Sequence, residues 1–165
     1  MPVVSSGVLW PDQANKLFYL YGGEYSSTTE VQSFETLWFY DTFRQTWNRS
    51  RFGALDQGTN PITWPASGAG TVDDDGVAYY YGGYLNNKTM PGWSGGAQMM
   101  SSLVAFDMNK NTWYNRTIDE VPRAEGSLHY IAAGKQGSLI YLGGVEQVAG
   151  QRQYVSLSEM GHGAR

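Results

Sequence analysis

The chain has 165 residues, of which 41% are apolar and 15% aromatic, so it is long enough for one domain with a sizeable core. Its net charge of −4 arises from 11 basic and 15 acidic residues without a block of either sign, which argues against nucleic-acid and anionic-membrane partners. The absence of cysteine excludes disulfides, thiolate metal sites and thiol nucleophiles. No run of about 18 apolar residues is present to span a membrane, and the first residues lack the features of a signal peptide.

Three aromatic-rich runs each end in two glycines. In chain order they are LFYLYGG, VAYYYGG and SLIYLGG, with the pairs Gly22 and Gly23, Gly82 and Gly83, and Gly143 and Gly144. A strand opened by Pro and Gly, followed by a tight turn rich in Asp, Asn and Gly, is expected before each run. After the first two pairs a loop leads to LWFYDTFRQTW and LVAFDMNKNTW, in which Asp41 precedes Trp47 as Asp107 precedes Trp113. The pattern predicts a repeated unit of four short strands.

This order of elements resembles the kelch repeat, which forms one blade of a β-propeller. The resemblance implies an all-β fold, a partial kelch-type β-propeller with about two complete four-stranded blades plus an incomplete third. The expected divisions are a blade at 1–50, a blade at 65–117, a partial blade at 122–157 and a tail at 158–165. Because kelch propellers close with about six or seven blades, and even the smallest propellers have about four, we expect the chain to be a fragment of a longer protein.

The repeated residues have a structural interpretation. Each glycine pair is expected to end the second strand of its unit, where a positive φ or a close backbone approach admits only glycine. The apolar run before it suits a strand buried between adjacent blades. Trp47 and Trp113 are expected to be equivalent residues of the blade core.

The direction of the strands places all the long connecting segments at one end of the fold, which is where we expect binding. These segments are 24–35, 48–66, 84–101, 114–125 and 145–156. Trp64 and Trp93 lie in the Pro- and Gly-rich loops NPITWPAS and TMPGWSGG and are the candidate binding residues. The alternative is that both pack beneath their own loops.

Three N-glycosylation sequons begin at Asn48, Asn87 and Asn115, whereas Asn60 is followed by Pro and is excluded. We expect all three to be exposed on the rim of the long-loop end, with Asn48 and Asn115 just past the outermost strands. Their number favours an extracellular or cell-surface protein, with any signal peptide or membrane anchor outside this chain.

Other polar residues are expected to be structural, and no metal or cofactor site is predicted. His129 lies on an innermost strand, and His162 is in the tail. The run Asp73 to Asp75 is interpreted as a solvated turn, because it lacks the ligand spacing of a calcium loop. Four acids flank the long-loop face without forming a pair that the sequence can place, namely Glu24, Glu35, Glu125 and Glu146.

The family resemblance extends to enzymes whose sites are not found here. Galactose-oxidase-like members use copper with a Tyr cross-linked to Cys, and nitrile-specifier-like members hold iron in a Glu-x3-Asp-x3-His pattern. The chain has no cysteine and no such pattern. The stretches LWPDQANKLFYLYGGEY and VPRAEGSLHYIAAGKQGSLIYLGGVE instead look like the kelch-repeat ectodomains of fungi.

The predicted function is therefore a non-catalytic extracellular module that binds a protein or a cell-surface glycan through its long-loop face. The alternative is a fragment of a galactose-oxidase-like or metal-dependent kelch enzyme whose active site lies outside this chain. Because the outward faces of the terminal blades lack neighbours, we expect the isolated chain to self-associate.

Overall fold

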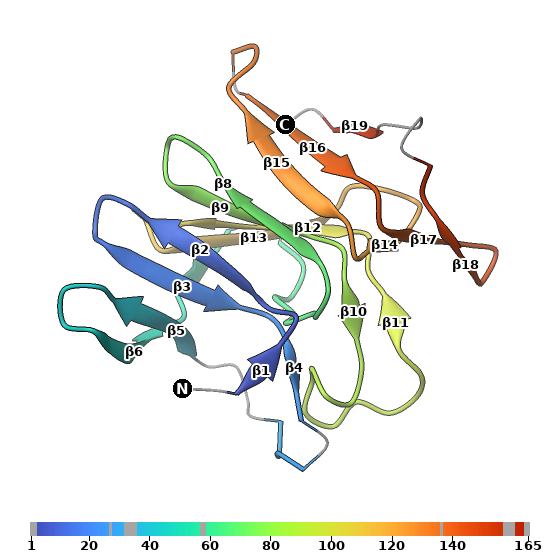
Figure 1. The fold of residues 1–165 in the computed structure, drawn as a ribbon, viewed down its shortest axis with the longest axis horizontal. Coiled ribbons are helices and arrows are strands. Elements are labelled where there is room, and N and C mark those ends of the chain that lie inside the picture. Colours follow the sequence, from blue (N-terminus) through green and yellow to red (C-terminus); the bar gives the residue numbers. More distant parts are fainter. Residues whose placement is uncertain are drawn as a thin grey trace.

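The fold is all-β. The computed structural model describes residues 3–26, 28–31, 36–56, 59–135, 137–156 and 161–163, the last only as backbone. Within these ranges there is no helix, and the strands form several mostly antiparallel sheets, an arrangement consistent with a partial β-propeller (Figure 1).

Three main sheets, here called units, follow one another along the chain. The first contains β2 (Val8–Asp12), β3 (Leu17–Tyr21), β5 (Thr36–Asp41) and β6 (Thr46–Arg51) in that order. The second contains β8 (Ala69–Val72), β9 (Val77–Tyr81), β12 (Ser102–Asp107) and β13 (Thr112–Thr117), with the short β7 (Ala54–Leu55) added in parallel to β13. The third contains β15 (Ser127–Ile131), β16 (Ser138–Leu142) and β19 (Gly161–Gly163).

The four antiparallel strands of the first two units match the order expected from the repeats. In the third unit β19 pairs with β16, the place that β5 and β12 occupy in the other units. Residues 161–163, which the sequence assigns to a tail, thus pair with the sheet. Such pairing satisfies backbone groups that an edge strand leaves open.

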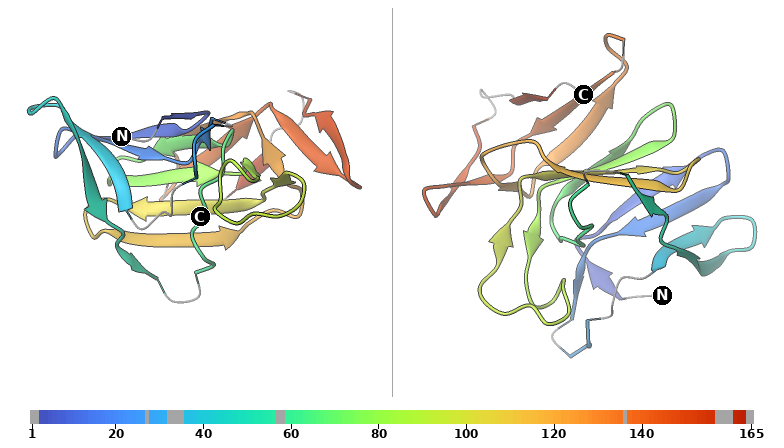
Figure 2. Two further views of the ribbon diagram at one scale, coloured as in Figure 1. Left: turned by 90° about the horizontal axis from the view of Figure 1, so that it is seen from below. Right: turned by 180° about the vertical axis from the view of Figure 1, so that it is seen from behind.

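The units lie side by side in chain order. Strand β8 contacts β2 on one side and β15 on the other. The views in Figures 1 and 2 agree that the second unit separates the first from the third. The second unit therefore offers one face to the first unit and the other face to the third.

An aromatic cluster fills the space between the first and second units. Trp113 on β13 is fully buried and stacks on Phe106, with ring centroids 4.2 Å apart. From the first unit, Trp10 and Tyr21 approach the same indole at 6.1 and 5.7 Å. A second cluster joins the next two units and contains Tyr79, Tyr81, Leu128 and Leu139. As expected, β9 is buried between its neighbours.

Trp47 does not share the environment of Trp113, so the expectation of equivalent core positions is wrong. Its ring lies against Tyr40 at 5.4 Å, but the side chain is only half-buried. In the second unit the corresponding tryptophan is covered by the first unit. No unit covers Trp47 in the described part of the chain, because the first unit has a neighbour on one side only.

Each glycine pair combines a positive φ with a close approach of neighbouring backbone, and both features favour glycine. The first glycines, Gly22 and Gly82, have φ of +68° and +70°. A Cβ on Gly22 would lie 2.3 Å from the carbonyl oxygen of Pro65, and one on Gly82 would lie 2.1 Å from that of Arg123. Both carbonyls belong to the following unit. The pair therefore ends the strand and also lets the next unit approach.

Backbone hydrogen bonds join neighbouring units near their innermost strands. Gly23 N donates to Pro65 O (3.2 Å), and Gly83 N donates to Arg123 O (2.8 Å). A second series connects residues that have positive φ, with Ser67 N donating to Ser6 O (2.9 Å) and Glu125 N donating to Ser67 O (2.7 Å). The same two bonds thus recur at both junctions.

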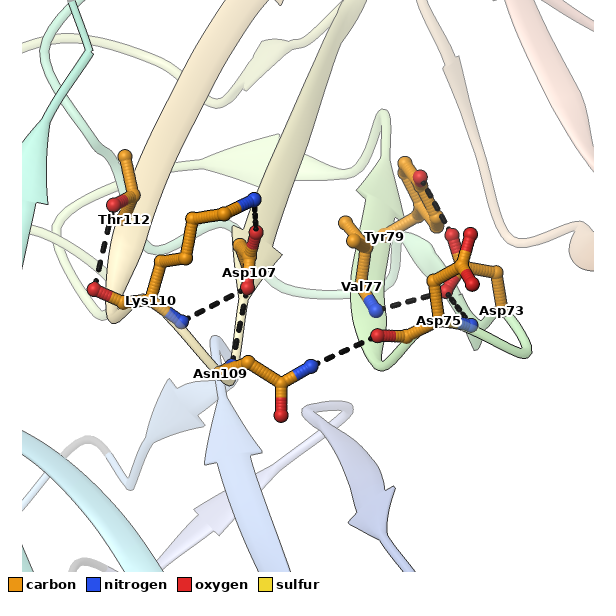
Figure 3. A network of polar contacts seen from close by, with 8 residues as sticks. All are labelled: Asp73, Asp75, Val77, Tyr79, Asp107, Asn109, Lys110 and Thr112. Carbon is orange, nitrogen blue, oxygen red and sulfur yellow. Dashed lines mark hydrogen bonds and ion pairs between the residues drawn. The ribbon is translucent and has the colours of Figure 1, made fainter. Parts of the chain in front are cut away.

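At the tight-turn end, aspartates close the turns (Figure 3). Asp107 Oδ1 accepts the backbone N–H groups of Asn109 and Lys110, and its Oδ2 is 2.7 Å from Lys110 Nζ. Asp41 binds its own turn in the same way. In the second unit, Asp73 accepts from the backbone N–H of Val77 and from the Tyr79 hydroxyl. Asp73 is thus a buried turn residue rather than a solvated one.

The segment from the end of β6 to the start of β8, here called the link between the first two units, departs from the expected course. Instead of staying at the long-loop end, it places β7 beside Thr112 and Trp113, at the start of β13. A Cβ on Gly53 would collide with Asn111 O, and Phe52 stacks on the Trp113 ring with centroids 4.4 Å apart. The link therefore forms part of the core.

Candidate functional site

Beyond each glycine pair the chain continues into a small sheet. These sheets are β1 (Val4–Ser5) with β4 (Glu24–Tyr25), β10 (Tyr84–Leu85) with β11 (Gln98–Met99), and β14 (Arg123–Ala124) with β17 (Val145–Val148) and β18 (Gln151–Tyr154). Figure 1 shows all three projecting away from the tight turns of the units. We call these seven strands and their connecting loops the long-loop end.

Arg123 connects the second and third units at this end. Its Nε lies 3.4 Å from Asp119 Oδ2, and its Nη1 lies 3.1 Å from Glu146 Oε2 on β17. The hydroxyl of Tyr81 also donates to Asp119, at 3.0 Å. The Arg123 side chain is 20% exposed, so its charge is largely enclosed by these partners. Removing either carboxylate would leave this largely enclosed cation with one charged partner instead of two.

The pKa shifts in this network favour a protonated Tyr81 and an ionised Asp119. Burial opposes ionisation of Asp119, but hydrogen bonds from the Val121 N–H, from Tyr81 and from Arg123 hold the pKa of its carboxyl below the usual range. Burial and then the Asp119 charge raise the pKa of Tyr81. At neutral pH Asp119 is therefore an acceptor and Tyr81 a donor.

A second group of polar residues surrounds Tyr84. Its hydroxyl donates to Glu125 Oε1 at 3.1 Å, and the guanidinium of Arg152 lies 4.5 Å from its ring centroid. Burial, followed by the Glu125 charge, raises the pKa of Tyr84 to about 12. Glu125 and Arg152 are both exposed. The surface thus presents one charge of each sign beside an aromatic ring.

Trp93 lies in the loop between β10 and β11, where the sequence placed it. Its side chain is half-buried, and its indole Nε1 donates to Gly96 O at 3.1 Å. The start of the loop is held to the first unit, because Asn86 Nδ2 donates to Glu24 Oε1 at 2.6 Å. Tyr25 N also donates to Lys88 O, at 3.0 Å. Trp93 is therefore an aromatic side chain on an anchored loop, with part of its ring open to solvent.

Trp64 is not at the surface, so the prediction that it contacts a ligand is wrong. The side chain is 5% exposed and packs against Tyr21, with ring centroids 4.7 Å apart, and against Phe52 at 5.6 Å. The link between the first two units carries it into the aromatic cluster. The alternative drawn from the sequence, packing beneath its own loop, describes it better.

The three sequons have different environments. Asn87 is exposed, in the loop that carries Trp93. Asn48 is half-buried and lies within β6 rather than past it. Asn115 lies within β13 and is 3% exposed, with its Nδ2 donating to Pro61 O. The expectation that Asn115 is exposed on the rim is therefore wrong, because the link between the units covers it.

The remaining candidates are placed as follows. His129 is exposed, and its Nε2 lies 3.2 Å from Ser127 Oγ. Glu24 and Glu146 have the side-chain partners given above, Asn86 and Arg123. Glu35 and the side chain of His162 lie outside the described residues. Among the described residues no group of three or more His, Cys, Asp or Glu is placed to hold a metal ion.

Comparison with known proteins gives one informative similarity. No family model matches the chain. Over 101 residues, or 56% of the chain, it is 34% identical to a Kelch repeat-containing protein of Arthroderma benhamiae. The matched part amounts to 15% of that relative's length. This similarity supports the kelch-repeat resemblance. The described residues contain no helix of the length and apolarity that crossing a bilayer requires.

Proposed function

We propose that the three units are blades of a kelch-type propeller and that the chain is a non-catalytic interaction module. The similarity to a kelch-repeat protein supports this proposal, as do the recurring strand order and the paired glycines. The incomplete third unit is then the beginning of a further blade, and the chain is part of a larger propeller.

In this proposal the ligand binds at the long-loop end and is a protein or a cell-surface glycan. The observation that carries it is the contrast between the two ends. In the first two units the tight-turn end consists of short turns closed by their own aspartates. The long-loop end instead presents the half-exposed ring of Trp93 and the exposed charges of Glu125 and Arg152. Aromatic rings with adjacent polar groups suit both sugar rings and protein surfaces.

The proposal includes an extracellular location for the parent protein. Exposure of Asn87 in a surface loop and its place in a sequon support this location. Asn48 is a second acceptor with partial exposure. In the proposed arrangement a glycan on Asn87 would lie on the same loop as Trp93 and would limit the approach of ligands from that side.

The experiment measures binding of the purified chain to a glycan array and to an array of purified cell-surface ectodomains. Trp93→Ala is compared with Phe43→Ala, whose side chain is 80% exposed on the opposite, tight-turn end. We expect Trp93→Ala to weaken binding at least about tenfold, which corresponds to about 1.4 kcal/mol. Phe43→Ala should bind like the wild type. Equal binding by all three proteins, or loss of binding with Phe43→Ala alone, would contradict the proposed surface.

A further inference from the structure

The link between the first two units runs along the outer edge of β13. Its backbone N–H groups donate to alternate carbonyl oxygens of this edge at 2.8–3.1 Å, in the pairs Ala54 to Asn111, Asp56 to Trp113 and Asn60 to Asn115. Because side chains alternate along a strand, Trp113 and Asn115 lie on the same face of β13. Both are buried, at 0% and 3% exposure. The link therefore covers two large side chains of the strand with which it pairs.

Four buried polar atoms at this junction have no hydrogen-bond partner among the described residues. They are Thr59 Oγ1 and Thr63 Oγ1 of the link, and Trp113 Nε1 and Asn115 Oδ1 of β13. In the described part of the chain, the buried side-chain nitrogens and oxygens without a partner all belong to this one junction. Buried polar groups that no protein group reaches are usually satisfied by bound water.

Neither a reversed amide nor burial alone accounts for these atoms. Asn115 Nδ2 donates to Pro61 O at 2.6 Å, so exchanging its amide nitrogen and oxygen would place two acceptors against each other. Trp113 belongs to the same aromatic cluster as Trp10, and both are almost completely buried. The Trp10 indole nevertheless has a partner, because its Nε1 donates to Tyr79 O at 3.1 Å.

The four groups match the hydrogen-bonding capacity of water. An indole N–H only donates, a carboxamide oxygen only accepts, and a threonine hydroxyl does either. A water molecule can accept from the indole and one hydroxyl, and can donate to the carboxamide oxygen and the other hydroxyl. A cation would face the indole N–H, and an anion would face the carboxamide oxygen. A neutral molecule that both donates and accepts therefore fits this set best.

We propose that these four groups bind at least one buried water molecule, which fastens the link to β13. The water bridges side chains of the link and of the strand, in addition to the direct backbone bonds between them. The site lies between the first and second units, where Tyr21, Phe52 and Trp64 surround the Trp113 ring with centroids 4.4–6.4 Å away. By holding the link in place, the water also holds Trp64 in the aromatic cluster.

Water-selective NOE and ROE spectra of the full ¹⁵N-labelled chain test for this water. A bound water molecule gives cross-peaks of opposite sign in the two spectra, whereas proton exchange gives the same sign in both. We expect the bound-water signature at the indole N–H of Trp113. The indole of Trp10 is the matched control and should show none, because it is equally buried but bonded to a carbonyl oxygen. No signal at Trp113, or equal signals at both indoles, would overturn the proposal.

Replacing the link hydroxyls tests whether the water fastens the link. Valine has the shape of threonine without its hydroxyl. Without water, Thr63→Val would remove a buried group that lacks a partner, and the link would become more stable. With water bound, the same change removes a hydrogen bond, and the link opens more readily. The direction of the effect therefore distinguishes the two cases.

The readout is hydrogen exchange of the Asn60 amide, which donates from the link to β13. We expect Thr59→Val and Thr63→Val each to speed this exchange at least about threefold. The matched control is Thr117→Val, which removes an exposed hydroxyl at the end of β13 and should leave the rate unchanged. The water signal at Trp113 should persist in each valine variant, because three partners remain. Its loss from either variant would show that the hydroxyl produced the signal and would overturn the proposal, as would unchanged or slower exchange in either.

Discussion

Replacing the two tryptophans near the start of the outer strands of the first two units should have very different effects on stability. Trp113 is fully buried and stacks on Phe106 and Phe52, with ring centroids 4.2 and 4.4 Å away. Trp113→Ala removes this packing and leaves a cavity, which should cost about 3–5 kcal/mol. Trp47 is half-buried against Tyr40, with no unit covering it among the described residues. Trp47→Ala should therefore cost only about 1 kcal/mol.

The assay is urea unfolding followed by circular dichroism, at a protein concentration low enough to keep all variants monomeric. Trp113→Phe provides a milder version that retains a ring and should cost less than Trp113→Ala, so the comparison survives if the alanine variant fails to fold. Equal losses at the two tryptophans, or a larger loss for Trp47→Ala, would refute the stacking of units described here.

The remaining predictions concern a glycine at a close backbone contact, the pH dependence of stability, and N-glycosylation. Gly82→Ala should lose clearly more stability in urea unfolding than Gly92→Ala. Both glycines have positive φ, but only at Gly82 would the new Cβ meet a carbonyl oxygen, at 2.1 Å. Burial opposes ionisation of Asp107, yet hydrogen bonds from a nearby lysine and its turn lower its pKa. The stabilisation is present above about pH 4 and lost on acidification, so Asp107→Asn should flatten the fall in melting temperature between about pH 4 and 2. In a secreting eukaryotic host, mass loss after glycosidase treatment should show glycans on exposed Asn87 and none on buried Asn115.

The sequence predicted the repeated strands well because their signals are local. The glycine pairs require positive φ, and the structure shows it at all six glycines. Asp107 precedes its tryptophan by a fixed spacing because its carboxylate closes the turn between β12 and β13. Such features depend on a few consecutive residues and can be recognised without knowing the tertiary structure.

What the sequence did not reveal depends on contacts between distant segments. Trp64 lies in a Pro-rich stretch typical of a surface loop, yet it is buried because the link between the units crosses the aromatic cluster. Asn115 is hidden by the same link. The network of Asp119, Arg123 and Glu146 also went unrecognised, since Arg123 meets Glu146 only when β14 pairs with β17.

The central claim is that successive units stack through repeated backbone bonds, and amide hydrogen exchange measured by NMR tests it most directly. We predict that the amides of Ser67, Gly83 and Glu125, which donate across the junctions, are protected to a similar degree as core strand amides. The amide of Gly92, in the loop with Trp93, should exchange quickly. Exchange of the three junction amides as fast as that of Gly92 would contradict the stacked arrangement.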